Sequence, residues 1–348
     1  MRRHGNIWVS LILIVSIIFS ACQNNLNTTN AVRTLETRAY GDKTPKIVTY
    51  IDVNDTNPLN AMLYRMDNEP FIDIVTIFAA NIRANGSEPQ LWLNDNVTKI
   101  LIPDAGSTTT GHYKYVQPLR QDGAKVLLSV LGDHQGVGVG NLTEVNQQKF
   151  AEILAWAVEE YDLDGIDFDD EWANYGENPN FPSSVDGSFS GLIIKLRNEL
   201  DERFPNEHKL ITVLNIGNAS TLSSDAIADC DFGWSGNFGP NTYNSNPILW
   251  PKEKWAAQAI DLSQLCSSSM FILNQISTRC AQTLNDSMGA ILTCGLRNHT
   301  ECDPLPVLQR IATAVYSNTV TRLSTPANGY TKDWSGDSGT VINYDDID

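Results

Sequence analysis

The chain has 348 residues, enough for one large domain or two ordinary ones, and a core is easily buried at that length. Its formal net charge of -17 argues against nucleic acid as a partner, because a phosphate backbone would be repelled.

The N-terminus carries Arg2 and Arg3, then an apolar run at residues 7–19, then two small residues before Cys22. The run is too short to span a bilayer and has the charged start of a secretory signal. The pattern resembles a bacterial lipoprotein cleavage site, at which the cysteine is lipidated. We therefore expect a signal peptide at 1–22 and a chain anchored through Cys22 to the membrane of the bacterial cell envelope, facing the periplasm or the outside. A plain cleaved signal is the alternative.

Five further cysteines follow Cys22, and an odd number gives no disulfide framework, although one or two bridges suit an oxidising envelope. Their spacings do not match a zinc site, and the histidines do not pair at ligand spacing. We expect no metal. Residues 23–45 are polar and aperiodic, which is typical of a flexible tether.

Eight β-rich apolar runs predict strands at residues 46–53, 73–80, 125–131, 163–171, 210–215, 231–234, 270–274 and 290–294. Near-continuous apolar strands indicate a parallel sheet covered by helices. Helical spacing predicts helices at 143–161, 189–200 and 307–316. Together these predict one α/β domain, a TIM (β/α)8-type barrel at 46–327. The irregular segment 216–250 predicts short or missing helices around strands 5 and 6, and 328–348 reads as a loosely attached acidic C-terminal tail.

The fourth run gathers five acidic residues among three apolar ones. Alternation along a strand places Asp167, Asp169 and Glu171 on one face, and Ile166 and Phe168 on the other. Same-side residues are about 6.6 Å apart, so three carboxyls fall within roughly 13 Å. Like charges this close raise the pKa of at least one member, which keeps a carboxylic acid protonated near neutral pH as a proton donor.

Two other interpretations of this run are weaker. A calcium loop needs a glycine at its sixth position, and counting from Asp167 that position is Trp172. A solvated acidic turn does not explain the alternation of Ile166 and Phe168.

Other polar residues fall where strands end, and barrel active sites gather at the C-terminal strand ends. Each alone is more often an ordinary loop residue, but their shared location favours a site. The candidate substrate contacts are Tyr50, Asn81, Gly132, His134, Gln135, Asn215 and Trp234.

Asp169 and Glu171 hang from one strand, so they cannot face each other across a bound sugar as the two carboxyls of a retaining glycosidase with a protein nucleophile do. A nucleophile on the substrate, such as a neighbouring N-acetyl group, is the alternative. Asp169 would then hold that acetamide and stabilise its developing charge, with Asp167 supporting Asp169.

The run D-G-I-D-F-D-D-E fits the D-G-x-D-x-D-x-E signature of glycoside hydrolase family 18. The chain also resembles the endoglycosidase H type of that family over about residues 47–234, in Y-I-D-V-N, I-F-A-A-N-I, K-V-L-L-S-V-L-G-D-H-Q-G and L-N-I-G. The resemblance implies cleavage of the chitobiose core of N-linked glycans, of the high-mannose or hybrid class, without a cofactor. It also implies that Glu171 is the proton donor, that Asp169 assists the acetamide, and that an oxazolinium forms with retained configuration.

The sequence departs from this type after the sixth strand, where relatives place a tyrosine that positions the N-acetyl group. Here Asn237 takes its place, with a shorter reach. We expect a monomeric enzyme acting on an N-glycan or glycoprotein. A chitinase of the same family and a non-catalytic glycan-binding barrel are the alternatives.

Overall fold

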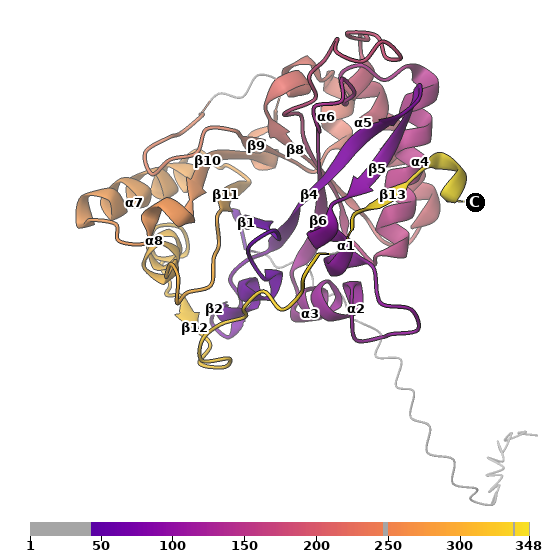
Figure 1. Ribbon diagram of the computed structural model, residues 1–348. Coiled ribbons are helices and arrows are strands. Elements are labelled where there is room, and N and C mark those ends of the chain that lie inside the picture. Colours follow the sequence, from indigo (N-terminus) through magenta and orange to yellow (C-terminus); the bar gives the residue numbers. More distant parts are fainter. Residues whose placement is uncertain (1–42, 246–249, 337, 348) are drawn as a thin grey trace, which may run out of the picture. The chain divides into compact units, whose positions relative to one another are not determined.

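The computed structural model describes residues 43–245, 250–336 and 338–347, so the signal peptide, Cys22 and most of the tether lie outside the described residues. Eight parallel strands form a closed barrel, because the last strand pairs with the first and the first with the second (Figure 1). The predicted TIM-type barrel is confirmed. Its strands are β1 (Lys46–Asp52), β4 (Ile74–Asn85), β6 (Lys125–Leu131), β7 (Gly165–Asp169), β8 (Leu210–Asn215), β9 (Phe232–Ser235), β10 (Trp255–Asp261) and β11 (Ala290–Cys294).

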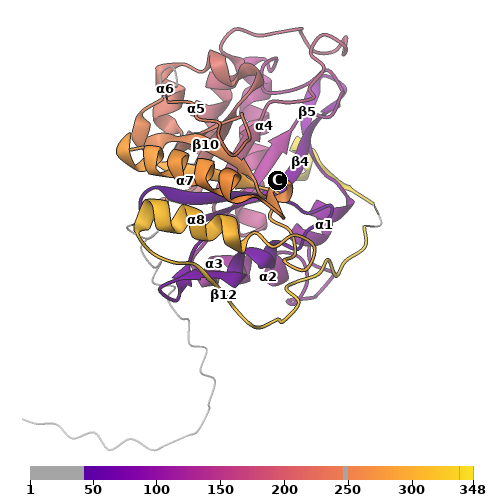
Figure 2. The same cartoon turned by 90° about the vertical axis from the view of Figure 1, so that its left-hand side faces the viewer.

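Helices cover the outside of the barrel, and the three predicted ones are present. Thr143 caps the longest of them by accepting the N–H of Asn146. Figure 2 shows α7 and α8 side by side on the outside. The helices are α1 (Asp95–Leu101), α2 (His112–Tyr115), α3 (Gln117–Asp122), α4 (Glu144–Glu160), α5 (Ser188–Arg203), α6 (Ser224–Asp229), α7 (Met270–Asn285) and α8 (Leu305–Tyr316).

Helices are short around the fifth and sixth barrel strands, as expected. After β8 come only the 3-10 turn η2 (Gly217–Thr221) and the six-residue α6. Between β9 and β10, the described residues contain a single 3-10 turn, η3 (Lys252–Lys254). The chain there is rich in glycine, asparagine and serine, which favour turns over helix.

The seventh predicted strand is wrong. Residues 270–274 begin helix α7, which Ser269 caps by accepting the N–H of Ile272. The seventh barrel strand is instead β10, with the sequence W-A-A-Q-A-I-D. Residues 270–274 are compatible with either structure, because a short apolar run does not distinguish strand from helix. The β10 strand gives a weak signal because its alanines have low β-propensity.

The acidic C-terminal segment is attached more closely than expected. β13 (Thr340–Ile342) pairs antiparallel with β5 (Glu88–Leu93), which itself pairs with the extended end of β4. Ile342 is buried, and Trp334 and Tyr330 pack against the core. The smaller elements are η1 (Pro58–Leu63), β2 (Tyr64–Met66), β3 (Glu69–Pro70), η4 (Leu262–Leu265), β12 (Thr321–Arg322) and η5 (Tyr344–Asp346).

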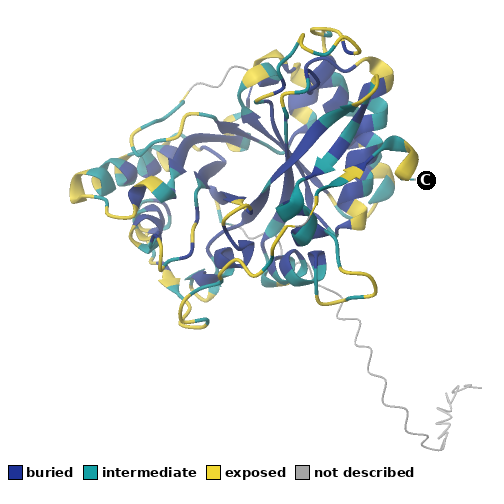
Figure 3. Ribbon diagram, in the orientation of Figure 1, coloured by how far each residue is buried: buried dark blue, intermediate teal, exposed yellow. Residues whose placement is uncertain are grey.

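One layer of the hydrophobic core lies inside the barrel, and the other lies between the strands and the surrounding helices. Figure 3 shows that the barrel strands are mostly buried. The alternation predicted for β7 is confirmed. Ile166 and Phe168 belong to the layer between strands and helices, where Phe168 meets Phe189 of α5 with ring centroids 5.4 Å apart. Asp167 points the other way and bonds to Tyr50 and Trp234, which belong to the barrel interior. In the described part of the chain, no helix is both long and apolar enough to cross a membrane.

Candidate active site

A cavity of about 320 Å³ lies at the C-terminal ends of the barrel strands, where barrel enzymes place their chemistry. Asp169 and Glu171 of the motif both line it. The rest of its wall comes from the ends of other strands and the loops after them: Tyr50, Asp52, Asp55, Thr56, Phe78, Leu214, Phe238, Asp261, Ser263, Cys294, Gly295, Leu296 and Arg297.

Asp167 is fully buried and accepts four side-chain hydrogen bonds. Tyr50 and Ser129 donate to Oδ2, each at 2.8 Å, while Thr212 and the Trp234 indole donate to Oδ1. Burial raises the pKa of Asp167, and these hydrogen bonds act in the opposite direction by stabilising the charged form. Both oxygens are thus satisfied, which fixes Asp167 beneath the cavity.

Asp169 is 3% exposed, and its Oδ1 is a buried atom without a hydrogen-bond partner among the described residues. Burial raises the pKa of Asp169 to about 8, with further increases from the charges of Glu171, Asp167 and Asp170. The sequence predicts a raised pKa from like charges in this cluster. Asp169 has such a raised pKa, but burial is a larger cause than the neighbouring charges. An unsatisfied oxygen in the wall of a cavity is suited to receive a donor from a ligand.

Glu171 lies two residues beyond the end of β7, so the strand is shorter than predicted. The loop after β6 holds this extension, because the Gly132 N–H donates to the Glu171 carbonyl at 3.0 Å and the His134 N–H to the Trp172 carbonyl at 2.7 Å. A Cβ at Gly132 would lie 2.4 Å from the Glu171 carbonyl oxygen. Only glycine permits this approach, so Gly132 supports the backbone of Glu171.

The remaining motif positions have structural roles. Asp164 lies at the opposite end of β7, where its carboxylate accepts from Lys125 at 2.9 Å and Arg120 at 3.0 Å. Gly165 leaves no room for a side chain, since a Cβ would lie 2.0 Å from the Leu210 carbonyl oxygen. Asp170 points away from Asp169 and accepts from Tyr175 and from Asn218, which anchors the loop after β8.

The other predicted contacts divide into three groups. Tyr50 lines the cavity, and Trp234 lies beneath it through Asp167. Asn81 donates to the Gly132 carbonyl at 2.9 Å, and Gln135 accepts from the Ala84 N–H at 3.2 Å, so both hold the β6 loop against β4.

Three further predicted contacts also lie outside the cavity wall. His134 is exposed and stands 3.2 Å from Asn174 through Nδ1. At the end of β8, Leu214 lines the cavity and Asn215 does not. After β9, Asn237 is exposed, and its neighbour Phe238 lines the cavity. The role of Asn237 toward an acetamide stays a prediction.

Sequence reasoning missed the side of the cavity formed by β10 and β11. Asp261 ends β10 and accepts from the backbone and hydroxyl of Ser263, at 2.9 and 2.6 Å. Burial and the Asp261 charge raise the pKa of the Cys294 thiol to about 12. The sequence offers one indication for these residues, namely their position at the end of a strand. For Asp261 even this indication is absent, because the strand that it ends, β10, is not predicted.

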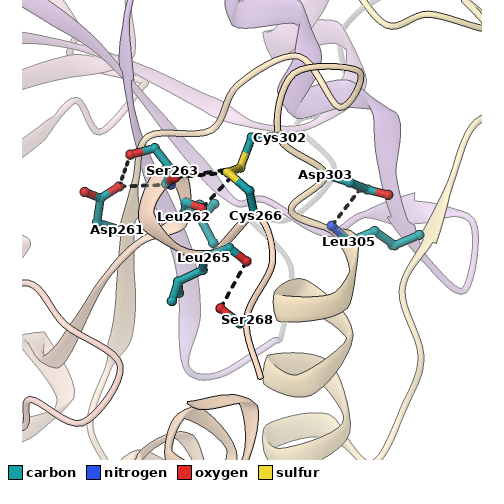
Figure 4. Close-up of a disulfide and its surroundings, with 9 residues drawn as sticks. All are labelled: Asp261, Leu262, Ser263, Leu265, Cys266, Ser268, Cys302, Asp303 and Leu305. Atoms are coloured by element: carbon teal, nitrogen blue, oxygen red, sulfur yellow. Dashed lines mark hydrogen bonds between the residues drawn. A yellow bond between two sulfur atoms is a disulfide. The ribbon is translucent and has the colours of Figure 1, made fainter. Parts of the chain in front are cut away.

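A disulfide between Cys266 and Cys302 joins the loops after β10 and β11 (Figure 4). Both loops contribute cavity residues, Ser263 in one and Arg297 in the other. Among the residues described, no group of three or more His, Cys, Asp or Glu side chains is arranged to hold a metal ion.

A closed parallel barrel with paired carboxyls in a cavity at its strand ends is the architecture of a barrel glycoside hydrolase. The chain matches the profile of glycosyl hydrolases family 18 over residues 46–232, more than half of its length, and it belongs to that family.

Curated relatives cover most of the chain. One is an endo-beta-N-acetylglucosaminidase of Flavobacterium sp. (strain SK1022), 32% identical over 80% of this chain and 82% of the relative. Another is endo-beta-N-acetylglucosaminidase F1 of Elizabethkingia meningoseptica, 28% identical over 83% of this chain and 82% of the relative. Among solved structures, Bacteroides thetaiotamicron EndoBT-3987 with a Man5GlcNAc product superposes with a TM-score of 0.66 at 23% identity, covering 89% of this chain and 68% of that one. That likeness supports the fold.

Proposed function

We propose that this chain is an endo-β-N-acetylglucosaminidase that cleaves the chitobiose core of N-linked glycans of the high-mannose or hybrid class. The observation that carries the proposal is the pairing, in one cavity, of Glu171 with an Asp169 whose Oδ1 has no protein partner in the described residues. The names of the Flavobacterium and Elizabethkingia relatives support the same activity.

In the proposed reaction, Glu171 gives a proton to the glycosidic oxygen between the two N-acetylglucosamines. The acetamide carbonyl of the sugar that contributes the anomeric carbon attacks that carbon. An oxazolinium forms as the bond to the leaving sugar breaks, and water then opens it with retained configuration. Asp169 accepts the acetamide N–H and stabilises the positive charge that develops on the ring. Burial raises the pKa of Asp169 to about 8 in the unliganded cavity. The proposed reaction therefore requires the bound acetamide N–H and the developing positive charge to lower this pKa, so that Asp169 is ionised when it acts.

Digestion of a defined high-mannose glycoprotein tests the proposal, with mass analysis for a single N-acetylglucosamine left on asparagine. The wild type should leave this product, and Glu171→Gln should bind glycan while cleaving at least 10³-fold more slowly. Release of soluble chitooligosaccharides without action on the glycoprotein would favour a chitinase. Equal and negligible release by wild type and variant would favour a glycan-binding barrel.

We also propose that the mature chain is anchored in the bacterial cell envelope by a lipid on Cys22. The support is the sequence pattern of residues 1–22. Metabolic labelling with an alkyne fatty acid should mark the wild type and leave Cys22→Ala unlabelled, and labelling of both would contradict the anchor.

A further inference from the structure

Trp172 is an exposed aromatic residue next to the proposed proton donor. It follows Glu171 directly, and 58% of its surface is exposed. It is not among the residues that line the cavity. The His134 ring lies beside it with centroids 5.5 Å apart and an interplanar angle of 49°. The two rings form an exposed aromatic ledge next to the backbone of Glu171.

The backbone holds this ledge in an unusual conformation. Trp172, His134 and Asn174 have φ values of 62°, 55° and 53°, a region that residues other than glycine rarely adopt. The His134 N–H donates to the Trp172 carbonyl at 2.7 Å, and the His134 ring reaches Asn174. Three such residues in contact concentrate backbone strain beside the acid, and strain of this kind clusters at ligand sites.

We propose that Trp172, flanked by His134, is the stacking platform for the sugar on the leaving-group side of the cleaved bond. This inference rests on the proposed function and names the residue that binds the N-acetylglucosamine that stays on asparagine.

The position of Glu171 carries the argument. The proton donor acts on the oxygen between two sugars, so the two rings lie on either side of it. The sugar whose acetamide reacts must reach Asp169, which is inside the cavity. The other ring then lies on the opposite side of Glu171, and Trp172 is the exposed aromatic residue that follows Glu171 directly in the chain.

The chemistry of the two surfaces also agrees. The substituents of a β-linked N-acetylglucosamine are equatorial, so each face of its ring presents C–H groups. An indole face matches such a surface and removes apolar area from water when the two stack. Trp172 leaves that face available, because most of its surface is exposed.

Two substrates separate this role from others. A high-mannose glycopeptide needs both sugars bound, whereas a preformed glycan oxazoline has already lost the leaving-group sugar. Stacking acts in the ground state and the transition state alike, so Trp172→Ala should raise KM for the glycopeptide about tenfold with little change in kcat. Oxazoline hydrolysis should stay within about twofold of wild type, and Trp172→Phe should recover most of the glycopeptide activity.

Phe271→Ala is the matched control, because Phe271 is an aromatic residue of α7 that is 69% exposed and lies outside the cavity wall. It should change neither reaction. Unchanged KM in Trp172→Ala, or equal losses on glycopeptide and oxazoline, would overturn the platform. If the wild type processed neither substrate, the proposed function itself would fall, and the platform with it.

Discussion

The two sides of the cavity are held in different ways. On the side of β7, the acids lie on or just beyond one strand, which the long helices α4 and α5 cover from outside (Figure 1). Hydrogen bonds from neighbouring strands fix Asp167 beneath them. On the side of β10 and β11, the wall consists of loops, and the Cys266–Cys302 disulfide ties two of them together. We call the β7 side the rigid side and the disulfide-linked loops after β10 and β11 the stapled side. We infer that proton transfer depends on the rigid side and that the fit of the substrate depends on the stapled side.

The largest effect should follow from a change on the rigid side. Asp169→Asn keeps the shape of the side chain but cannot form the carboxylate that, in the substrate complex, accepts the acetamide N–H and stabilises the oxazolinium, so kcat should fall about 10²- to 10³-fold. The measurement is kcat on a high-mannose glycopeptide at pH 6. A loss smaller than tenfold would mean that the acetamide is held by another group.

The same variant should become more stable relative to wild type as the pH rises. Asp169 has a pKa of about 8 in the fold and an ordinary value of 3.8 when exposed. Between these values the folded state holds a proton that the unfolded state has lost, so wild-type stability falls with rising pH. Asparagine does not titrate. Denaturant unfolding should therefore show Asp169→Asn gaining about 5 kcal/mol on the wild type between pH 4 and pH 8, and a constant difference would contradict the buried, protonated carboxyl.

On the stapled side, loss of the disulfide should affect stability and fit more than chemistry. The bridge closes a loop with a sequence separation of 36, and chain entropy then predicts a loss of about 3–4 kcal/mol in the free energy of unfolding. The double variant Cys266→Ser/Cys302→Ser should raise KM several-fold because Ser263 and Arg297 lie on the freed loops, with kcat nearly unchanged.

Reductant provides the control for this variant. It should bring the wild type to the level of the double variant and leave the double variant unaffected. If kcat fell as much as KM rose, the loops would contribute to the transition state, and the proposed division between the two sides would be wrong.

How far the sequence predicts each side follows from the kind of signal it carries. Strict alternation with apolar residues identifies the acids on and after β7 in the sequence. The structure places Asp169 and Glu171 in the cavity and Asp167 beneath it. The hydrogen-bond partners of Asp167, Ser129 and Thr212, cannot be identified in this way. They lie 38 and 45 residues from Asp167 in the sequence and meet it only through the strand register. On the other side, the strand that positions Asp261 was itself missed. Contacts set by register and by loops leave no local periodicity to read.

The smallest effect should settle which residue after β9 faces the substrate. The sequence points to Asn237, in the place of a family tyrosine, whereas Phe238 lines the cavity and Asn237 is exposed. Removing a wall residue costs apolar contact with the bound sugar, so Phe238→Ala should lower kcat/KM about fivefold. Asn237→Ala should change it less than twofold if its side chain stays in water. A larger loss in Asn237→Ala than in Phe238→Ala would place the Asn237 amide against the acetamide. A loop residue would then contribute to catalysis, which contradicts the inference that the loops determine only how the substrate fits.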